Sequence, residues 1–188
     1  PSSSDNVDIE FQQPLVSVSV SPLSVDEDEA DNLVYTISRD CASAPITVNF
    51  SASGTAIFNT DYSQTGAATF DGTTGTVFMD AGVSSVTITF DPVADNTVEP
   101  DESITLTLLS GNGYQLSAGM DTATGTILND DTATLTISNL EQAETDDGTT
   151  NFTFQVALDQ AVDMPFTVDF ATADGTAAVS DGDYVANS

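Results

Sequence analysis

Carboxylates dominate the chemistry available to this chain. It has 30 Asp and Glu residues against one basic residue, Arg39, and it has no His. The acids concentrate where runs of alternating apolar residues end, at 26–29, Asp61, 95–102 and 130–131. Carboxylates from separate loops repel one another unless a hard cation binds them, and Ca²⁺ takes about six to eight oxygen ligands. Two interpretations stay open on charge alone, a calcium site and ordinary solvated loop acids.

The same composition argues against several other functions. Without His or Lys, the usual general base and the amine nucleophile are missing, so we predict that the chain is not an enzyme. A formal net charge of −29 repels phosphates and anionic lipid head groups. We therefore expect neither nucleic-acid binding nor membrane insertion. The single cation, Arg39, ends a predicted strand, where we expect it to pair with a nearby acid.

The acidic loops do not follow a contiguous calcium motif. The sequence has no EF-hand loop and no tandem glycine-rich nonapeptides. Any calcium site must therefore be assembled from loops that are distant in sequence. The elements between these loops have to bring them to one place.

Short runs of apolar residues at every second position predict those elements to be β-strands. Ser and Thr occupy most of the intervening positions, and Gly, Asn and Asp clusters separate the runs. This pattern predicts an all-β protein with a sandwich of two sheets. Clear examples of the alternating runs are 16–20, 46–50, 86–90 and 104–108.

An internal repeat sets the domain organisation. The segment 48–62, which contains Val-Asn-Phe, Gly-Thr-Ala and Asp-Tyr, recurs with small insertions as 168–184. Upstream, 35–37 corresponds to 154–156, and 16–20 corresponds to 133–137. We therefore predict a complete repeat at 14–131 and a second, incomplete repeat at 132–188.

Residues 1–13 precede the first repeat as an N-terminal extension. Val7, Ile9 and Phe11 alternate with Asp8 and Glu10, so the segment has the period of a strand. Two interpretations stay open: a linker or the tail of a preceding domain, and an extra strand that is donated to a neighbouring molecule.

Several of these motifs together resemble the Calx-beta repeat. They are Gly54-Thr55-Ala56 with Asp61-Tyr62, the segment 98–102 before the run 104–108, and Gly125-Thr126-Ile127-Leu128-Asn129-Asp130-Asp131. The resemblance implies a seven-stranded, immunoglobulin-like antiparallel β-sandwich that binds calcium through loops at one end. Calx-beta modules occur in sodium–calcium exchangers, in an integrin subunit and in many large bacterial surface proteins.

The resemblance also implies which residues bind the calcium. Asn129 stands where the family has an acid, and Ala94-Asp95-Asn96 replaces the acidic run of exchanger-type modules, so it implies fewer ions or weaker binding. The implied ligands are Glu27, Asp61, Asp95, Glu99, Glu102, Asp130 and Asp131 in the first repeat, with Glu144 and Asp183 as counterparts in the second.

These observations lead to one principal hypothesis and two alternatives. The principal hypothesis is a calcium-binding structural or adhesive module of a large extracellular or cell-surface repeat protein, with calcium rigidifying the inter-repeat junction. Its partners would be calcium ions, neighbouring repeats or identical subunits, and cell-surface or matrix components. The alternatives are a self-assembling extracellular filament subunit, completed by a strand from a neighbour, and a calcium-sensing regulatory module.

Overall fold

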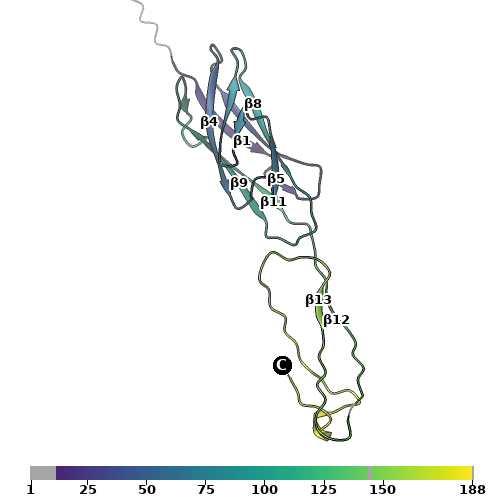
Figure 1. Ribbon diagram of the computed structural model, residues 1–188. Coiled ribbons are helices and arrows are strands. Elements are labelled where there is room, and N and C mark those ends of the chain that lie inside the picture. Colours follow the sequence, from purple (N-terminus) through teal and green to yellow (C-terminus); the bar gives the residue numbers. More distant parts are fainter. Residues whose placement is uncertain (1–11, 144, 188) are drawn as a thin grey trace, which may run out of the picture.

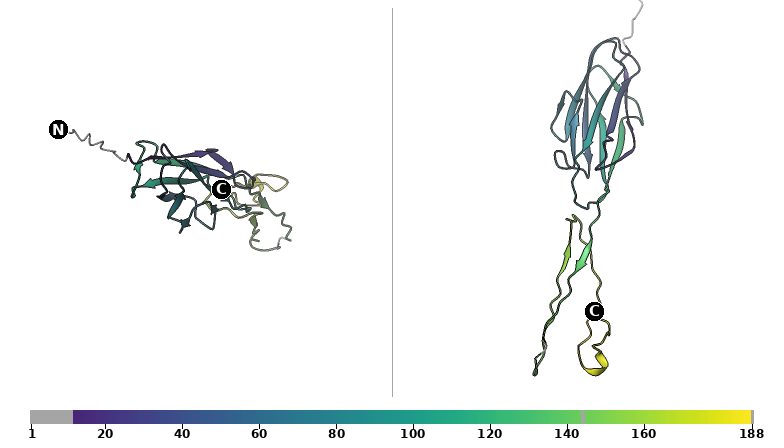
Figure 2. Two further views of the ribbon diagram at one scale, coloured as in Figure 1. Left: turned by 90° about the horizontal axis from the view of Figure 1, so that it is seen from above. Right: turned by 90° about the vertical axis from the view of Figure 1, so that its right-hand side faces the viewer.

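The computed structural model describes residues 12–143 and 145–187. These residues form an elongated molecule, with a compact β-sandwich at one end and a second, open part at the other (Figures 1 and 2). The described residues contain strands and one short 3₁₀ helix but no α-helix. None of their helical residues form a segment that is long and apolar enough to cross a membrane.

The first sheet of the sandwich has five strands in the order β10-β1-β3-β8-β5. The long strands β1, β3 and β8 pair antiparallel, and the short strand β10 pairs parallel with β1. The strands are β1 (Leu15–Ser21), β3 (Leu33–Arg39), β5 (Tyr62–Thr65), β8 (Ser85–Pro92) and β10 (Gln115–Leu116).

The second sheet has six strands in the order β2-β11-β9-β4-β7-β6. It is antiparallel except at one edge, where β2 pairs parallel with β11. Its strands are β2 (Ser24–Asp26), β4 (Ile46–Gly54), β6 (Thr69–Phe70), β7 (Thr74–Met79), β9 (Glu102–Leu109) and β11 (Thr122–Leu128).

The predicted all-β sandwich is confirmed, with one difference in its edges. Seven strands have six or more residues: β1, β3, β4, β7, β8, β9 and β11. The additional short strands β2 and β10 introduce parallel pairs that the prediction of an antiparallel sandwich did not contain. The chain crosses from the first sheet to the second between Ser21 and Ser24, so that β1 pairs with β10 and β2 pairs with β11.

The core lies between the two sheets and is filled by the predicted alternating residues. Tyr35, Phe50 and Phe90 are fully buried. The Tyr35 hydroxyl crosses the core, donating to the Ile104 carbonyl at 2.5 Å and accepting from the Gly125 N–H at 2.9 Å. Tyr35 belongs to the first sheet and both partners to the second, so this side chain links the sheets. A Cβ at Gly125 would lie 2.9 Å from both Leu33 Cδ atoms and 3.0 Å from the Tyr35 hydroxyl, so a larger residue would have to displace these side chains.

Arg39 lies at the end of the sandwich that also contains Leu15. The expected pairing of Arg39 with an acid is wrong. Its side chain is 95% buried, and it donates to the carbonyl oxygens of Val83 at 2.7 Å, Ala44 at 2.5 Å and Asp80 at 2.5 Å. The planar guanidinium suits this role because its five donors form a fixed fork. Arg39 therefore fastens two loops at this end of the sandwich to each other.

Replacement of Arg39 by Lys should destabilise the first repeat by about 2–4 kcal/mol, because one ammonium cannot reach three carbonyls and buried carbonyls lose their donors. Urea unfolding monitored by circular dichroism measures this loss. Thr87→Ser on the exposed side of β8 is the matched control and should change stability by no more than about 0.5 kcal/mol. Equal stability of Arg39→Lys and the parent would show that the three bonds contribute nothing.

The second repeat has little regular structure. It contains a two-stranded sheet of β12 (Leu135–Ile137) and β13 (Val156–Leu158) and a 3₁₀ turn, η1 (Val179–Asp181). Leu135 lies opposite Leu158, whereas the repeat correspondence would place it opposite Val156. This two-residue shift keeps each side chain on the same face. Register is weakly specified because, among residues 12–143 and 145–187, no second sheet packs on this pair.

Apolar side chains of the second repeat are exposed where their counterparts in the first repeat are buried. Phe154 is 51% exposed, whereas its counterpart Tyr35 is fully buried. Phe170 is 62% exposed, whereas its counterpart Phe50 is fully buried. The described part of the second repeat has no strands corresponding to β7, β8, β9 and β11, which cover these positions in the first repeat.

Candidate metal centre

Alternating strand directions bring the loops after β2, β4, β8 and β11 to one end of the sandwich. We call this end, formed by 27–32, 55–61, 93–101 and 129–131, the acidic pole. It faces the second repeat, whereas the described chain begins at the opposite end of the sandwich (Figure 1). The fold thus gathers the predicted acidic loops at one place, next to the start of the second repeat.

Asp61 is positioned by the turn that follows β4. Gly54 leaves β4 with a φ of 142°, and a Cβ there would lie 2.0 Å from the Ser103 carbonyl oxygen, so only glycine allows this approach. Asp61 Oδ2 then accepts the Ile57 N–H at 2.5 Å, which closes the turn. Asp61 is held at the pole by both features.

Asp61, Glu99 and Glu102 form the tightest group of acids. Each offers one carboxylate oxygen, and the three oxygens lie within 4.8 Å of one another. Two oxygens bound to the same calcium ion, at about 2.3–2.6 Å each, are at most about 5 Å apart. The three side chains therefore have a spacing compatible with ligands of one ion.

Burial and repulsion perturb Glu102 and Glu99. Burial, a hydrogen bond with Asp61 and the charges of Asp61, Glu99 and Glu27 raise the pKa of Glu102 to about 7. Burial raises the pKa of Glu99 as well, assisted by the charges of Asp61, Asp95, Asp163 and Asp131. Negative charge at this pole is thus costly without a cation.

Glu27 is the most buried acid at the pole, with only 7% of its surface exposed. Its N–H donates to the Leu128 carbonyl at 3.0 Å, which fixes the residue beside the end of β11. Within the described part of the chain, no hydrogen bond reaches its carboxylate. Burial, followed by the charges of Asp95, Glu99, Asp131 and Asp28, raises its pKa to about 7. A buried, unpaired carboxylate is unfavourable unless a cation binds it.

Asp131 adds an oxygen that is shielded from solvent. Its Oδ2 is shielded from solvent and has no hydrogen-bond partner in residues 12–143 and 145–187. Desolvation raises the pKa of Asp131, with further contributions from Asp28, Asp130 and Asp95. This oxygen is available to a cation at no loss of an existing bond.

Asn129 holds two acidic loops together rather than offering a free ligand. Its Oδ1 accepts the Glu99 N–H at 2.9 Å, and its own N–H donates to Asp101 Oδ1 at 3.1 Å. Its side-chain amide also donates to the Asp131 carbonyl at 3.1 Å. Asn129 therefore positions Glu99 and Asp131 relative to each other.

The residues present fit a hard cation. The acidic pole offers carboxylate oxygens and no His or Cys, and the one basic side chain of the sequence, Arg39, lies at the opposite end of the sandwich. Oxygen-only ligands suit Ca²⁺. Mg²⁺ fits less well because it requires near-octahedral geometry and keeps several of its waters.

The comparisons with known proteins gave matches among solved structures alone. No protein-family model matches the chain, and no curated protein matches it. The crystal structure of CBD12 from CALX1.2 and that of calcium binding domain CBD12 of CALX1.1 each match with a TM-score of 0.47 and 24% identity over 61% of this chain. The match covers 45% and 44% of those two chains, so this protein spans less than half of their length. The apo-form Calx CBD1 domain matches with a TM-score of 0.46 and 24% identity, over 62% of this chain and 99% of that one.

The structure brings some of the sequence-predicted acids together and leaves others apart. Asp95 is exposed at the rim of the pole, and its Oδ1 accepts the Thr97 N–H at 2.5 Å. Asp130 is exposed beside Asp131. Asp183 lies in the second repeat, where its Oδ2 accepts the Ala178 N–H at 3.0 Å. Glu144 lies outside the described residues. The acids gathered at the pole are Glu27, Asp61, Asp95, Glu99, Glu102, Asp130 and Asp131.

Two acids that the sequence did not single out as ligands also raise pKa values at the pole. Asp28 raises the pKa of Glu27 and of Asp131, and Asp163 raises that of Glu99. Asp28 lies in the acidic run 26–29, so its neighbourhood was a usable signal. Asp163 belongs to the second repeat, and no motif indicates that this repeat reaches Glu99.

The raised pKa values predict how stability depends on pH without calcium. Glu27 and Glu102 titrate near pH 7 when folded and near 4.5 when unfolded, so the folded protein binds more protons in between. The free energy of unfolding in EDTA should therefore fall as the pH rises from about 4.5 to about 7. Hydrogen bonds from Thr74 and Thr73 lower the pKa of Asp71, so this residue changes the free energy of unfolding only at lower pH.

Urea unfolding at several pH values in EDTA checks this slope, and the double variant Glu27→Gln/Glu102→Gln should flatten it. Calcium competes with these protons, so its affinity should rise over the same pH window. A parent protein that becomes more stable between pH 4.5 and 7 in EDTA would contradict the assigned cause.

Proposed function

We propose that this chain is a calcium-binding structural and adhesive module of a large extracellular or cell-surface repeat protein. In this proposal calcium binds at the acidic pole and rigidifies the junction between the two repeats. The observation that carries it is the convergence of Asp61, Glu99 and Glu102 next to Glu27, a buried carboxylate without a hydrogen-bond partner among the described residues.

Asp61, Glu99 and Glu102 would provide the first ligands. Glu27 and the shielded oxygen of Asp131 extend the same group of acids. A bound calcium ion would supply the positive charge that this pole lacks and would convert mutual repulsion into attraction. The role is one of binding and mechanical support rather than catalysis.

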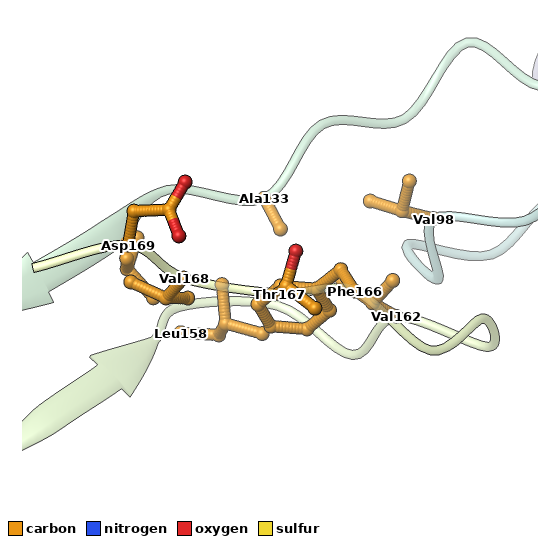
Figure 3. Close-up of a pocket in the computed structure, with 9 residues that line it drawn as sticks. Val98, Ala133, Leu158, Val162, Phe166, Thr167, Val168 and Asp169 are labelled. Carbon is orange, nitrogen blue, oxygen red and sulfur yellow. The ribbon is translucent and has the colours of Figure 1, made fainter.

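The contacts between the repeats support a role for calcium at the junction. The Val98 N–H donates to the Ala161 carbonyl at 3.0 Å, and the Asp163 N–H donates to the Val98 carbonyl at 3.0 Å. Val98 also lines one groove with Ala133 and Val162 of the second repeat (Figure 3). Since Val98 directly precedes Glu99, a ligand loop of the pole is also the loop that holds the second repeat.

Charge works against this contact when no cation is bound. The charge of Asp163 opposes that of Glu99 across the junction. Asp131, at the other side of the junction, ends the first repeat and leads into the second. A cation bound by Glu99 and Asp131 would remove this repulsion and would hold both connections between the repeats.

The ligand set suits calcium concentrations found outside cells. Asn129 contributes no charge, and its side-chain oxygen is already bonded to the Glu99 N–H. Fewer charged ligands lower the affinity for calcium, and extracellular modules work at about 10⁻⁴–10⁻³ M. Weak sites of this kind stay occupied in an extracellular medium.

Isothermal titration with calcium tests the site. Glu99→Gln and Glu102→Gln should each weaken binding by about tenfold or more, because each removes a charge and an anionic ligand, and the double variant should bind no measurable calcium. Asp121→Asn, which lies just before β11 and so at the far end of that strand from the pole, is the matched control and should bind like the parent. Unchanged affinity in the double variant would reject the site.

Distance measurements between spin labels test the junction. One label is placed on Cys41, which is exposed, and a second on Ser180→Cys in the second repeat. The distance distribution should be broad in EDTA and narrow in calcium, and calcium should have no effect in the Glu99→Gln/Glu102→Gln variant. Equal widths in EDTA and calcium in the parent would refute junction rigidification even if calcium binds.

A further inference from the structure

The strand β13 of the second repeat has an open edge. In the first repeat, the corresponding strand β3 lies between β1 and β8. In the second repeat, β13 pairs with β12 alone among the described residues. In the first repeat β8 helps to cover the apolar side chains of β3. Their counterparts in the second repeat are exposed, with Phe152 at 46%, Phe154 at 51% and Val156 at 52%.

The sequence of β8 shows what kind of strand covers such an edge. Its residues Val86, Ile88 and Phe90 follow the pattern Val-x-Ile-x-Phe, and Ile88 and Phe90 are fully buried. This pattern occurs at one other place in the 188 residues, at Val7, Ile9 and Phe11. We propose that residues 7–11 of one molecule bind along residues 152–156 of a neighbouring molecule, the segment that leads into β13, in the position that β8 takes beside β3.

The register of the first repeat specifies the contacts. There Leu33 lies opposite Phe90, Tyr35 opposite Ile88, and Ile37 opposite Val86. The repeat correspondence places Phe11 opposite Phe152, Ile9 opposite Phe154, and Val7 opposite Val156. Every apolar residue of the added strand thus meets an exposed apolar residue of the second repeat.

Aromatic packing supports the same alignment. The Phe90 ring packs edge-on against Tyr35 and Tyr62, with centroids 5.1 and 5.2 Å apart. The counterparts of these two residues in the second repeat are Phe154 and Tyr184, which leaves the place of Phe90 for Phe11. Asp8 and Glu10 would take the outward positions that Thr87 and Thr89 hold on β8.

Chain length requires the donor to be another molecule. Five Cα–Cα steps of 3.8 Å keep Val7 within about 19 Å of Gln12. Gln12 lines a groove with Cys41, Ala44 and Gly113, in the loops at the end of the sandwich away from the acidic pole. A strand as long as β4, with nine residues, already spans about 30 Å. Donor and acceptor thus lie at opposite ends of each molecule, and such a head-to-tail interface joins successive molecules into a ring or an open chain.

This assembly makes no use of the acidic pole, so it is tested in EDTA, separately from calcium binding. Salt should keep the Debye length below about 10 Å, because each copy carries a net charge of −29. Light scattering on the full chain should show oligomers that grow with concentration. Deletion of residues 1–11 should give monomers, and it keeps the Pro14 carbonyl that accepts the Gln115 N–H at 2.9 Å.

A fluorescent peptide of residues 1–13 then maps the contact by anisotropy on the chain that lacks residues 1–11. The peptide should bind, Ile9→Asp in the peptide should abolish binding, and Glu10→Gln should retain it. Phe154→Asp in the acceptor should also abolish binding. Phe78→Asp, which alters a residue that is 51% exposed on the first repeat, is the matched control.

Either of two results would overturn the proposal. One is a full chain that stays monomeric across the concentration range. The other is peptide binding that survives both Ile9→Asp and Phe154→Asp. Ile9→Asp lies in the peptide and cannot alter the folding of the acceptor, so it decides the question even if Phe154→Asp disturbs the second repeat.

Discussion

Repulsion among carboxylates at the acidic pole is the constraint on which the rest of this molecule depends. Two like charges 4 Å apart near a protein surface cost about 4 kcal/mol, and here several acids converge. The sandwich core has to hold them in place against that force. Tyr35, which crosses the core to bond Ile104 and Gly125, shows how firmly the sheets that carry these loops are joined. A rigid scaffold thus maintains a site whose own residues repel one another.

The two repeats show what makes such a scaffold rigid. They share alternating apolar residues and the Gly-Thr-Ala and Asp-Tyr motifs, yet one is compact and the other is open. The turn before Asp183 forms even so, because Asp183 Oδ2 accepts the Ala178 N–H much as Asp61 Oδ2 accepts the Ile57 N–H. Local hydrogen bonds are therefore enough to shape the ligand turn. Gathering acids from separate loops requires the packed second sheet.

The sequence was sufficient to predict the strands and the acidic loops, because both depend on local pattern. Alternation of apolar residues placed Ile46–Phe50 and Ile104–Leu108 in strands, and the two-sheet sandwich followed from the number and spacing of such runs. The partners of Arg39 were not predictable, since backbone carbonyls leave no mark in a sequence. The proximity of Asp163 to Glu99 was missed for a related reason. It depends on how the second repeat lies against Val98, which is a property of packing rather than of any motif.

The burial of Arg39 affects how proteases can cleave this protein. Proteases that cut after basic residues find a single site in the whole sequence, and the folded first repeat conceals it. With no lysine, the side chains also offer no amine to aldehydes or to acylating reagents. The carbonyl contacts that bury Arg39 therefore conceal the one trypsin site of the folded first repeat, while the lack of lysine separately leaves the side chains without a target for amine reagents.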